Sequence, residues 1–539
     1  MNDETENLES GGAAWGRWVG VLLCLAVWFG PTPAGMPPAA QRLAAIATLM
    51  AVWWVTNAWP IAVTSLLPTV LFPLLGIQSA KVVSTAYFSD SSCLYLGGFM
   101  LALGVEKWGL HRRIALITIS LLGSSPKRIV LGFLSATFFL SMWMSNTATT
   151  LVMLPIALSL LNSMGELASD QQGVPKGDPQ LDRLATAVLL GIAYAASIGG
   201  VTTLVGTPTN IVFGDLFLRS FPDAPRISAG EWMVVWVPFG LVFLMFCWML
   251  LSWGLKPSAS MARLDASFFR ERLRQLGAMS RGEQAMAYLF VITALLWMFR
   301  IDFRLTETLS IHGWGDWVIA GLEAWQVKAK PHELADWVSD ATVAMLVALL
   351  MFLIRVPTES GRWQTLMDWP TASKLPWDIL LLFGGGFALA DAFRTTGLAE
   401  WAGKAFAEHS AHQPAWVLVA AVCLILVFMT EFTTNVATVN AVLPILATAS
   451  IGLGVDPRLL MIPATISASC GFMLPIGTPP NAIVFGTGRV TAAQMAKYGL
   501  VMNLVGVVLT VLTTLFLLAP QMGIEPGKLP AWVSTRQAP

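Results

Sequence analysis

Two short polar segments interrupt long apolar stretches of this sequence and constrain its fold more than any other feature. The first is Ser145-Asn146-Thr147, and the second is Thr434-Asn435-Val436, 289 residues further along the chain. Another hydroxyl residue stands four positions before each, Ser141 in the first stretch and Thr430 in the second. Backbone polar groups in a lipid bilayer must be hydrogen-bonded inside the protein, so such a break is tolerated only where it is buried or lines a cavity. We therefore interpret each stretch as a re-entrant hairpin, two half-length helices that meet at a tip.

The composition supports an all-α polytopic membrane protein. Hydrophobic residues make up 55% of the 539 residues and charged residues 12%, about half of the charged fraction of soluble domains. The net charge of zero gives no reason to expect a nucleic-acid partner. The five cysteines stand singly in apolar stretches, so neither a disulfide framework nor a metal cluster is expected. The other apolar stretches predict spans at about 15–30, 41–59, 61–77, 92–104, 184–198, 233–255, 284–301, 339–355, 380–393 and 497–520.

Polar stretches divide the chain into two halves with matching features. Residues 1–14 form an acidic tail without the basic segment of a signal peptide, so no cleaved signal or transit peptide is expected. A basic linker at 256–283 separates a first half, 15–255, from a second half, 284–520, and a tail of 521–539 follows. The first half contains hairpin 129–162 and interrupted helix 184–225, and the second half contains hairpin 415–453 and interrupted helix 459–487. Interrupted segments at matching positions of an internal repeat indicate a secondary transporter whose site lies where the repeats meet.

Basic residues set the expected orientation in the membrane. They concentrate in 105–128, which we interpret as an amphipathic, partly interfacial helix, in the linker 256–283, and in the Arg355–Lys374 loop. Cytoplasmic segments are enriched in Lys and Arg, so we place all three on that side. Counting spans then makes the first hairpin enter from the cytoplasm and the second from outside, an inverted-topology repeat with a cytoplasmic N-terminal tail and an external C-terminal tail. The linker is expected to be a connector, with a membrane-surface or regulatory helix as the alternative.

A second pair of related segments follows the hairpins. They are Gly206-Thr207-Pro208-Thr209-Asn210 and Gly477-Thr478-Pro479-Pro480-Asn481. Glycine would permit a positive φ where a helix breaks, and proline suits the first turn of the next helix. Carbonyls at helix C-termini attract Na⁺, whereas amides at helix N-termini attract an anion. We predict that these segments and the two tips form one site at mid-membrane. None of the four contains Lys or Arg, so hydroxyls, amides and helix ends would hold the anion, with bound cations supplying the countercharge.

One carboxylate lies beside this predicted site. Glu431 follows Thr430, whereas the first hairpin has Met142 at the matching position. An acidic residue at membrane depth costs about 2.5–3.5 kcal/mol on insertion scales, so it is expected to have a task. We favour a brace that accepts amide hydrogen bonds over capture of a proton or cation. His409 and His412 are expected to be surface residues, and the sequence contains no catalytic triad, zinc signature or phosphate loop, so an enzyme is not expected.

At these paired motifs the sequence resembles the divalent anion:sodium symporter family, whose members carry dicarboxylates, citrate or sulfate. A single polar tripeptide in a membrane helix most often serves helix packing, but four related elements in the same order in both halves favour function. The resemblance covers about residues 40–520. It implies about eleven transmembrane helices plus two re-entrant hairpins, scaffold and transport subdomains, a homodimer in the plasma membrane, and elevator-type alternating access.

The resemblance also implies the site residues by position. The sodium ligands would be Ser141, Ser145, Asn146 and Gly206 in one site and Thr430, Thr433, Asn435 and Gly477 in the other. The substrate-binding residues would be Asn146, Thr147, Thr207, Thr434, Asn435, Val436, Thr478 and Pro479. The family pattern at 434–436 is Ser-Asn-Thr, so Val436 lacks an expected hydroxyl and the exact substrate stays open.

The implied activity is import of a divalent organic anion coupled to Na⁺ as the co-transported ion, without an organic cofactor. The anion would be a C4-dicarboxylate such as succinate, malate or fumarate, or else citrate. The alternatives are a sodium-independent dicarboxylate exchanger and a symporter of sulfate or another inorganic anion. An anion channel is the least expected of these functions.

Overall fold

The structure, a computed structural model, is a bundle of helices. It describes residues 11–56, 58–122, 125–169, 179–256, 267–300, 303–304, 310–324, 338–358, 361–410, 413–525 and 527–534. Within these residues the strands form two short antiparallel pairs, β1 (Phe303–Arg304) with β2 (Ser310–Ile311), and β3 (Arg355–Pro357) with β4 (Trp363–Thr365). The predominantly helical class is therefore confirmed.

Helices occur in both parts of the chain, before and after residue 256. The first half contains α2 (Gly11–Phe29), α3 (Pro38–Thr56), α4 (Ile61–Ser65), α5 (Leu67–Leu74), α6 (Ala80–Ala86), α7 (Asp90–Lys107), α8 (Leu110–Leu122), α9 (Pro126–Ser141), α10 (Asn146–Ser169), α11 (Pro179–Gly200), α12 (Pro208–Ser220) and α13 (Ala229–Ser252). The remainder contains α14 (Ser267–Gln275), α15 (Arg281–Met298), α16 (Trp314–Ala324), α18 (Asp340–Leu353), α19 (Trp369–Ala372), α20 (Trp377–Thr395), α21 (Leu398–Ser410), α22 (Ala415–Met429), α23 (Asn435–Gly452), α24 (Arg458–Ala468), α25 (Pro479–Phe485), α26 (Ala492–Thr513), the π-helix Thr514–Leu518, α27 (Ala519–Gln521) and α28 (Ala531–Ser534). α2 begins inside the predicted N-terminal tail of 1–14.

Four described helices are long and apolar enough to cross a membrane. They are Pro179–Gly200, Ala229–Ser252, Asn435–Gly452 and Ala492–Gln521. The α20–α21 pair, bent by 75° after Thr395, would count as a fifth. One predicted span, the stretch 61–77, divides into α4 and α5 just before Pro68, which cannot donate a backbone hydrogen bond. The total of about eleven spans stays a prediction.

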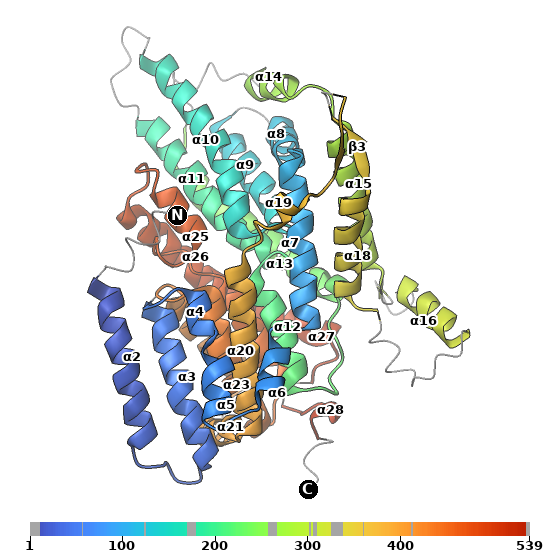
Figure 1. The fold of residues 1–539 in the computed structure, drawn as a ribbon. Helices are drawn as coiled ribbons and strands as arrows, with labels where there is room; N and C mark the ends of the chain where they lie inside the picture. The colour runs from blue at the N-terminus through green and yellow to red at the C-terminus, as the bar shows by residue number, and fades with distance from the viewer. Residues whose placement is uncertain are drawn as a thin grey trace.

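The stretches predicted as hairpins and as interrupted helices each contain a pair of helices, and their re-entry into the membrane stays a prediction. α9–α10 spans Pro126–Ser169 and α22–α23 spans Ala415–Gly452, close to the predicted 129–162 and 415–453. α11 ends at Gly200 and α24 ends at Ala468. After each break the next helix, α12 or α25, begins at the first proline of the Gly-Thr-Pro segment. In Figure 1, α9, α10 and α11 occupy the upper half and α20, α21 and α23 the lower half, so the two hairpins approach the middle from opposite ends.

The linker is anchored to α8. α14 lies within 256–283 and packs on α8. Arg113 of α8 forms a buried ion pair with Glu283 at 3.0 Å and donates a hydrogen bond to the Gly277 carbonyl, also at 3.0 Å. Glu283 in turn accepts a hydrogen bond from the Ser280 amide at 2.8 Å and caps the start of α15. These contacts fit the predicted connector, because its end is fixed to the helix that precedes the first hairpin.

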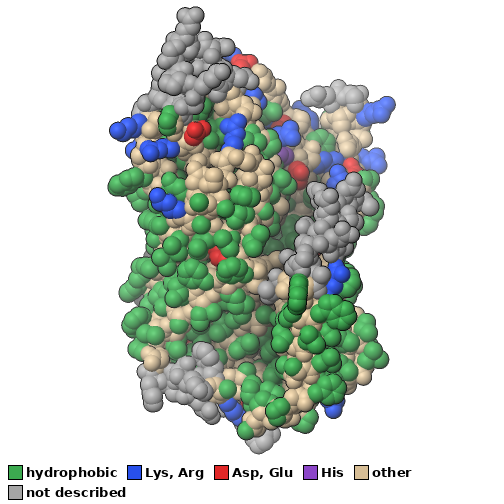
Figure 2. Space-filling model, turned by 90° about the vertical axis from the view of Figure 1, so that its left-hand side faces the viewer, with side chains coloured by type: hydrophobic (Ala, Val, Ile, Leu, Met, Phe, Trp, Pro, Cys, Tyr) green, Lys and Arg blue, Asp and Glu red, His purple; other side chains and the backbone are tan. Residues whose placement is uncertain are grey.

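Basic side chains gather at one end of the molecule. On the face shown in Figure 2, Lys and Arg cluster near the top, and apolar side chains dominate the middle and lower parts. In Figure 1 this end carries α8, α14 and β3, which belong to the three basic segments of the sequence. At the same end Lys107 lies 2.7 Å from Asp368. Hydrogen bonds from Lys107 and Thr371 hold the pKa of the Asp368 carboxyl below its ordinary value, so this tie between α7 and α19 stays charged at neutral pH.

Candidate functional site

The first tip gathers three oxygen atoms around one proton. The hydroxyl oxygen of Ser141, at the end of α9, lies 2.8 Å from Asn146 Oδ1 and 2.6 Å from the Ala196 carbonyl oxygen of α11. A serine hydroxyl carries one hydrogen, so it can donate to one of these acceptors at a time. Ser145 accepts a hydrogen bond from the Ala148 amide at 3.2 Å and so caps the start of α10. The result is a buried group of oxygens with fewer donors than acceptors, which favours a cation.

The second tip repeats this arrangement with different residues. The Thr430 hydroxyl oxygen lies 2.9 Å from Asn435 Oδ1 and 2.7 Å from the Ala468 carbonyl oxygen of α24. Thr434 caps α23 by accepting a hydrogen bond from the Ala437 amide at 3.3 Å. The hydroxyl, the amide oxygen and the broken-helix carbonyl thus correspond one to one between the two tips.

Each broken helix is held open by the asparagine that ends its Gly-Thr-Pro segment. Asn210 Nδ2 donates to the Thr203 carbonyl at 2.7 Å, and Asn481 Nδ2 donates to the Leu474 carbonyl at 3.0 Å. Both asparagines are fully buried, and among the residues that the structure describes the Oδ1 of each has no hydrogen-bond partner. These residues were not among the predicted site residues, although their matching places in the two segments were a usable signal.

The positive φ expected at Gly206 and Gly477 was wrong. Neither glycine has a positive φ. A Cβ at Gly206 would instead lie 2.6 Å from the Gly200 carbonyl oxygen and 2.9 Å from those of Ser141 and Met142. Glycine is required there because three carbonyl oxygens approach the backbone closely. Oxygens at the C-terminal ends of broken helices are the kind of ligand that Na⁺ takes in transporters of this architecture.

The second tip differs from the first by a buried carboxylate. Glu431 accepts hydrogen bonds from the amides of Met473 and Leu474 at 2.8 and 2.9 Å and from Asn503 Nδ2 at 2.6 Å. The predicted brace is therefore confirmed. A Cβ at Gly477 would lie 2.8 Å from Glu431 Oε2, so this carboxylate also borders the backbone of the second Gly-Thr-Pro segment.

The first tip braces its loop without a charge. The hydroxyl of Thr203 donates to the Met142 carbonyl and accepts a hydrogen bond from the Gly206 amide at 3.0 Å. Thr203 was not predicted from the sequence, because nothing in the second half has a hydroxyl at the matching position, Leu474. The loop at the first tip is therefore braced by a neutral hydroxyl, that of Thr203, and the loop at the second tip by a carboxylate, that of Glu431.

The two broken helices meet directly. The hydroxyls of Thr209, in the first turn of α12, and Ser469, just after α24, lie 2.8 Å apart. α12 packs on α23 and α24, and α25 packs on α10 and α11. Each half therefore contributes a helix to the surroundings of the other half's tip, and the four polar segments form one region.

The remaining predicted residues occupy different positions in this region. Thr207 and Thr478 are buried N-cap residues of α12 and α25. Thr478 accepts a hydrogen bond from the Asn481 amide at 3.4 Å, whereas the Thr207 hydroxyl lies 3.4 Å from that of Thr209. Val436 is buried in the first turn of α23.

The other three predicted residues lie in the second hairpin, in α10 and in α25. The Thr433 hydroxyl donates a hydrogen bond to the Met429 carbonyl at 3.1 Å and is hydrogen-bonded to the Thr438 hydroxyl, so both partners lie in the second hairpin. Thr147 is half-buried in the first turn of α10, and Pro479 is exposed at the start of α25.

Two hairpin tips facing two broken helices inside an apolar helical bundle define the class of membrane transporters that bind their cargo near mid-membrane. Solved transporters share the fold. The chain matches MtrF of Neisseria gonorrhoeae, from a class of antimetabolite efflux pumps, with a TM-score of 0.52 and 15% identity over 97% of both chains. It also matches the YdaH transporter of Alcanivorax borkumensis, with a TM-score of 0.50 and 14% identity over 94% of this chain and 98% of that one.

The chain belongs to the family described as the sodium:sulfate symporter transmembrane region, whose pattern matches residues 12–519. It is 38% identical to the sodium-dependent dicarboxylate transporter SdcS of Staphylococcus saprophyticus over 89% of this chain and 86% of the relative. It is 37% identical to SdcS of Staphylococcus aureus over 96% of this chain and 93% of the relative. The family resemblance seen in the motifs is thereby confirmed, and the chain is a multi-pass transporter of the plasma membrane rather than an enzyme.

Proposed function

We propose that this chain imports a divalent organic anion together with Na⁺. The observation that carries the proposal is the duplicated tip, in which a hydroxyl, an Asn amide oxygen and a broken-helix carbonyl share one proton at Ser141 and again at Thr430. Such oxygen-rich groups favour a small hard cation. The names of the relatives, sodium-dependent dicarboxylate transporters, support Na⁺ as the cation and a dicarboxylate as the anion.

The site residues are part of this proposal. The first Na⁺ would be held by Ser141, Ser145, Asn146 and the carbonyls around Gly206, and the second by Thr430, Thr433, Asn435 and the backbone at Gly477. The anion would lie between the tips, against Asn146, Thr147, Thr207, Thr434, Asn435, Val436, Thr478 and Pro479. Support comes from the helices α10, α12 and α23, which begin in this region and direct backbone amides toward it.

Charge balance favours coupling to cations. None of the four polar segments contains Lys or Arg, so an unaccompanied dianion would lack countercharge. Importing two negative charges against an inside-negative potential costs about 2 × 2.3 kcal/mol per 100 mV. Two Na⁺ ions would cancel that charge, and a third would make import electrically favourable.

We further propose that transport proceeds by an elevator-type alternating-access movement in a homodimer of inverted-topology repeats. Each protomer would contain about eleven transmembrane helices plus the two hairpins, with the basic end and the N-terminal tail in the cytoplasm and the C-terminal tail outside. The approach of the hairpins from opposite ends supports the inverted repeat (Figure 1). The clustering of basic residues at one end supports the orientation.

The substrate proposed is a C4-dicarboxylate such as succinate, malate or fumarate, with citrate and sulfate as the competitors to be tested. The protein reconstituted in liposomes should take up labelled succinate when Na⁺ is outside and fail to do so when K⁺ replaces it. Uptake that ignores Na⁺ but requires an internal dicarboxylate would instead identify an exchanger. Labelled sulfate taken up in preference to succinate would identify an inorganic-anion symporter, and non-saturable flux would identify a channel.

A further inference from the structure

Two ion pairs bridge a seam that runs beside α12. On one side is the site bundle, which we define as α9–α13 with α22–α26. On the other side is the frame, which we define as α2–α7 with α15, α18 and α20. α12 of the site bundle packs against α7 and α20 of the frame. The site bundle carries the oxygen groups of both tips, so any movement of the site relative to the membrane must shear this seam.

The first ion pair centres on Arg219 in the last turn of α12. Its guanidinium contacts the carboxylate of Asp215, one turn earlier on the same helix, and lies 2.7 Å from Asp391 Oδ2 on α20. It also stands over the ring of Phe387 on α20, with 5.1 Å from the guanidinium carbon to the ring centroid. One cation therefore holds two carboxylates, one on its own helix and one across the seam.

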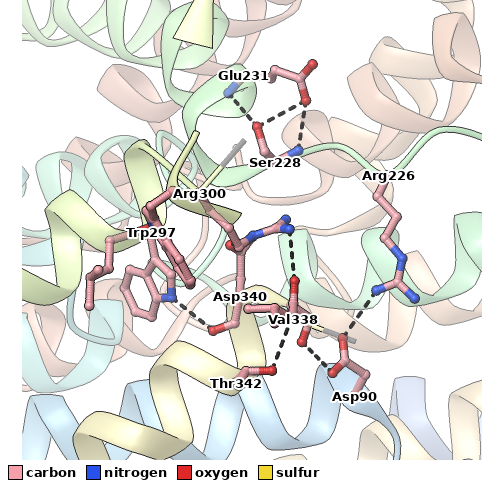
Figure 3. Close-up of polar contacts among 12 residues, drawn as sticks. Asp90, Arg226, Ser228, Glu231, Trp297, Arg300, Val338, Asp340 and Thr342 are labelled. Carbon is pink, nitrogen blue, oxygen red and sulfur yellow. Dashed lines mark hydrogen bonds and ion pairs between the residues drawn. The ribbon is translucent and has the colours of Figure 1, made fainter. Parts of the chain in front are cut away.

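The second ion pair lies where the seam is incompletely filled. Arg226, in the loop after α12, lies 3.5 Å from Asp90 at the start of α7, and Asp90 also accepts a hydrogen bond from the Ser339 hydroxyl at 2.7 Å (Figure 3). A cavity of about 80 Å³ opens here between α12, α7 and the start of α18. Its lining includes the buried Asn210, which braces the first broken helix. An ion pair thus connects the frame to the site bundle beside a cavity, where fewer apolar side chains pack across the seam.

The frame contains a third ion pair that does not bridge the seam. Arg300, just after α15, lies 2.6 Å from Asp340 at the start of α18, and both side chains are nearly fully buried (Figure 3). Trp297 donates its indole N–H to the Asp340 carbonyl at 3.0 Å in the same place. This pair lines the same cavity and has similar chemistry, but both of its members belong to the frame.

We propose that Arg219 is a positioning residue that ties the site bundle to the frame in this conformation and releases Asp391 when the site moves. The inference rests on the proposed alternating-access function. Leaving a buried charge without a partner is strongly unfavourable. Because Asp215 lies on the same helix as Arg219, it moves with the guanidinium and keeps it paired after release. The Arg219–Asp391 ion pair therefore stabilises one conformation and still leaves the other accessible. A purely structural ion pair, with no second carboxylate to keep the arginine paired, would make the other conformation inaccessible.

A thiol placed in the seam reports on its opening. A Cβ at Gly98 of α7 would lie 3.8 Å from Val205 Cγ1 in the loop before α12, so a Gly98→Cys side chain would be covered by Val205 in this conformation. The measurement uses the full-length protein with its five native cysteines replaced and follows the labelling rate of that thiol by a water-soluble maleimide, without substrate. Asp391→Asn should speed labelling about three- to tenfold, the range expected for loss of a partly buried charge pair.

Matched variants distinguish release of the Arg219–Asp391 ion pair from a general loosening of the fold. Asp340→Asn, which weakens the ion pair within the frame, should leave the labelling rate unchanged, and Asp391→Glu should restore slow labelling. An unchanged rate in Asp391→Asn, or equal acceleration in Asp391→Asn and Asp340→Asn, would overturn the inference. Monodisperse elution of each variant in size-exclusion chromatography confirms that it folds.

A cross-link tests the premise of movement independently of the substrate. The Cβ atoms at Gly98 and Val205 would be 3.9 Å apart, within the range of about 3.5–4.5 Å found in disulfides. The pair Gly98→Cys with Val205→Cys should form a disulfide that stops uptake until a reductant is added. Uptake that continues in fully cross-linked protein would refute a moving seam, and the tie with it. The labelling assay needs neither Na⁺ nor anion, so an error in the proposed substrate would not affect its outcome.

Discussion

Replacing Glu431 with glutamine should weaken Na⁺ binding at the second tip more than it weakens the fold. The carboxylate accepts hydrogen bonds from two backbone amides and from Asn503. Glutamine has the same shape, but one of its two terminal groups is a donor. If its oxygen faces Met473 and Asn503, its NH₂ group faces the Leu474 amide, and that buried N–H loses its partner.

The structure allows the loss of stability and the loss of Na⁺ affinity to be estimated. A buried donor left unpaired costs about 1–3 kcal/mol, which lowers stability without unfolding a large helical bundle. The lost charge lies beside the second tip, because Glu431 directly follows Thr430 and its Oε2 would lie 2.8 Å from a Cβ at Gly477. A cation about 5 Å from a carboxylate at an effective dielectric constant of about 20 gains about 3 kcal/mol. The apparent Na⁺ affinity should therefore fall by about a hundredfold.

Two assays on purified Glu431→Gln protein check this reasoning. The first is the Na⁺ concentration for half-maximal succinate uptake in liposomes, and the second is the rise in Tm that Na⁺ produces, since an ion that binds the folded state stabilises it. Asp340→Asn, which neutralises a buried carboxylate far along the chain, serves as the control. A well-folded Glu431→Gln protein with wild-type Na⁺ dependence in both assays would refute a role for this charge at the cation site.

The other predictions concern single positions in the site. Asn146→Ala and Asn435→Ala should each reduce uptake at least about a hundredfold while the protein still inserts, because each removes an amide whose oxygen would bind the cation and whose NH₂ group would donate to the anion; near-normal uptake by either variant contradicts a shared site. Val436→Thr should raise succinate uptake relative to citrate by the equivalent of about 0.5–1.5 kcal/mol, one added hydrogen bond, and an unaltered ratio in competition assays means that this side chain does not contact the substrate. Gly206→Ala should weaken Na⁺ binding by forcing three carbonyls apart, at a cost of about 1–3 kcal/mol, whereas Gly214→Ala, which meets no atom within 4 Å, should behave as wild type.

Features that depend on local sequence were predictable. The second hairpin was expected at 415–453 and is Ala415–Gly452, because a polar tripeptide between two apolar stretches determines both the break and the cap at Thr434. The brace by Glu431 was also expected, since an isolated carboxylate at membrane depth needs donors. The prolines of the Gly-Thr-Pro segments begin α12 and α25, where a missing amide costs nothing.

Features that depend on distant contacts were not predictable. The requirement for glycine at Gly206 comes from the Gly200 carbonyl of its own interrupted helix and from the Ser141 and Met142 carbonyls of the first hairpin, which approach only in the folded bundle, so the local argument from φ failed. The Thr209–Ser469 contact joins the two halves across 260 positions, and no local pattern marks it. Arg219 and Asp391 likewise lie 172 positions apart. Periodicity identifies helices, but it does not specify which of their polar residues meet.

The most direct test of two cation sites built from duplicated tips is the Na⁺ dependence of succinate uptake in three proteins: wild type, Ser141→Ala and Thr430→Val. Each substitution removes one hydroxyl oxygen from one group and leaves the other group intact. The account predicts a sigmoidal Na⁺ curve for the wild type and, for each variant, a higher half-saturating Na⁺ concentration with a Hill coefficient closer to one. Uptake that does not depend on Na⁺, or wild-type Na⁺ curves in both well-folded variants, would contradict it.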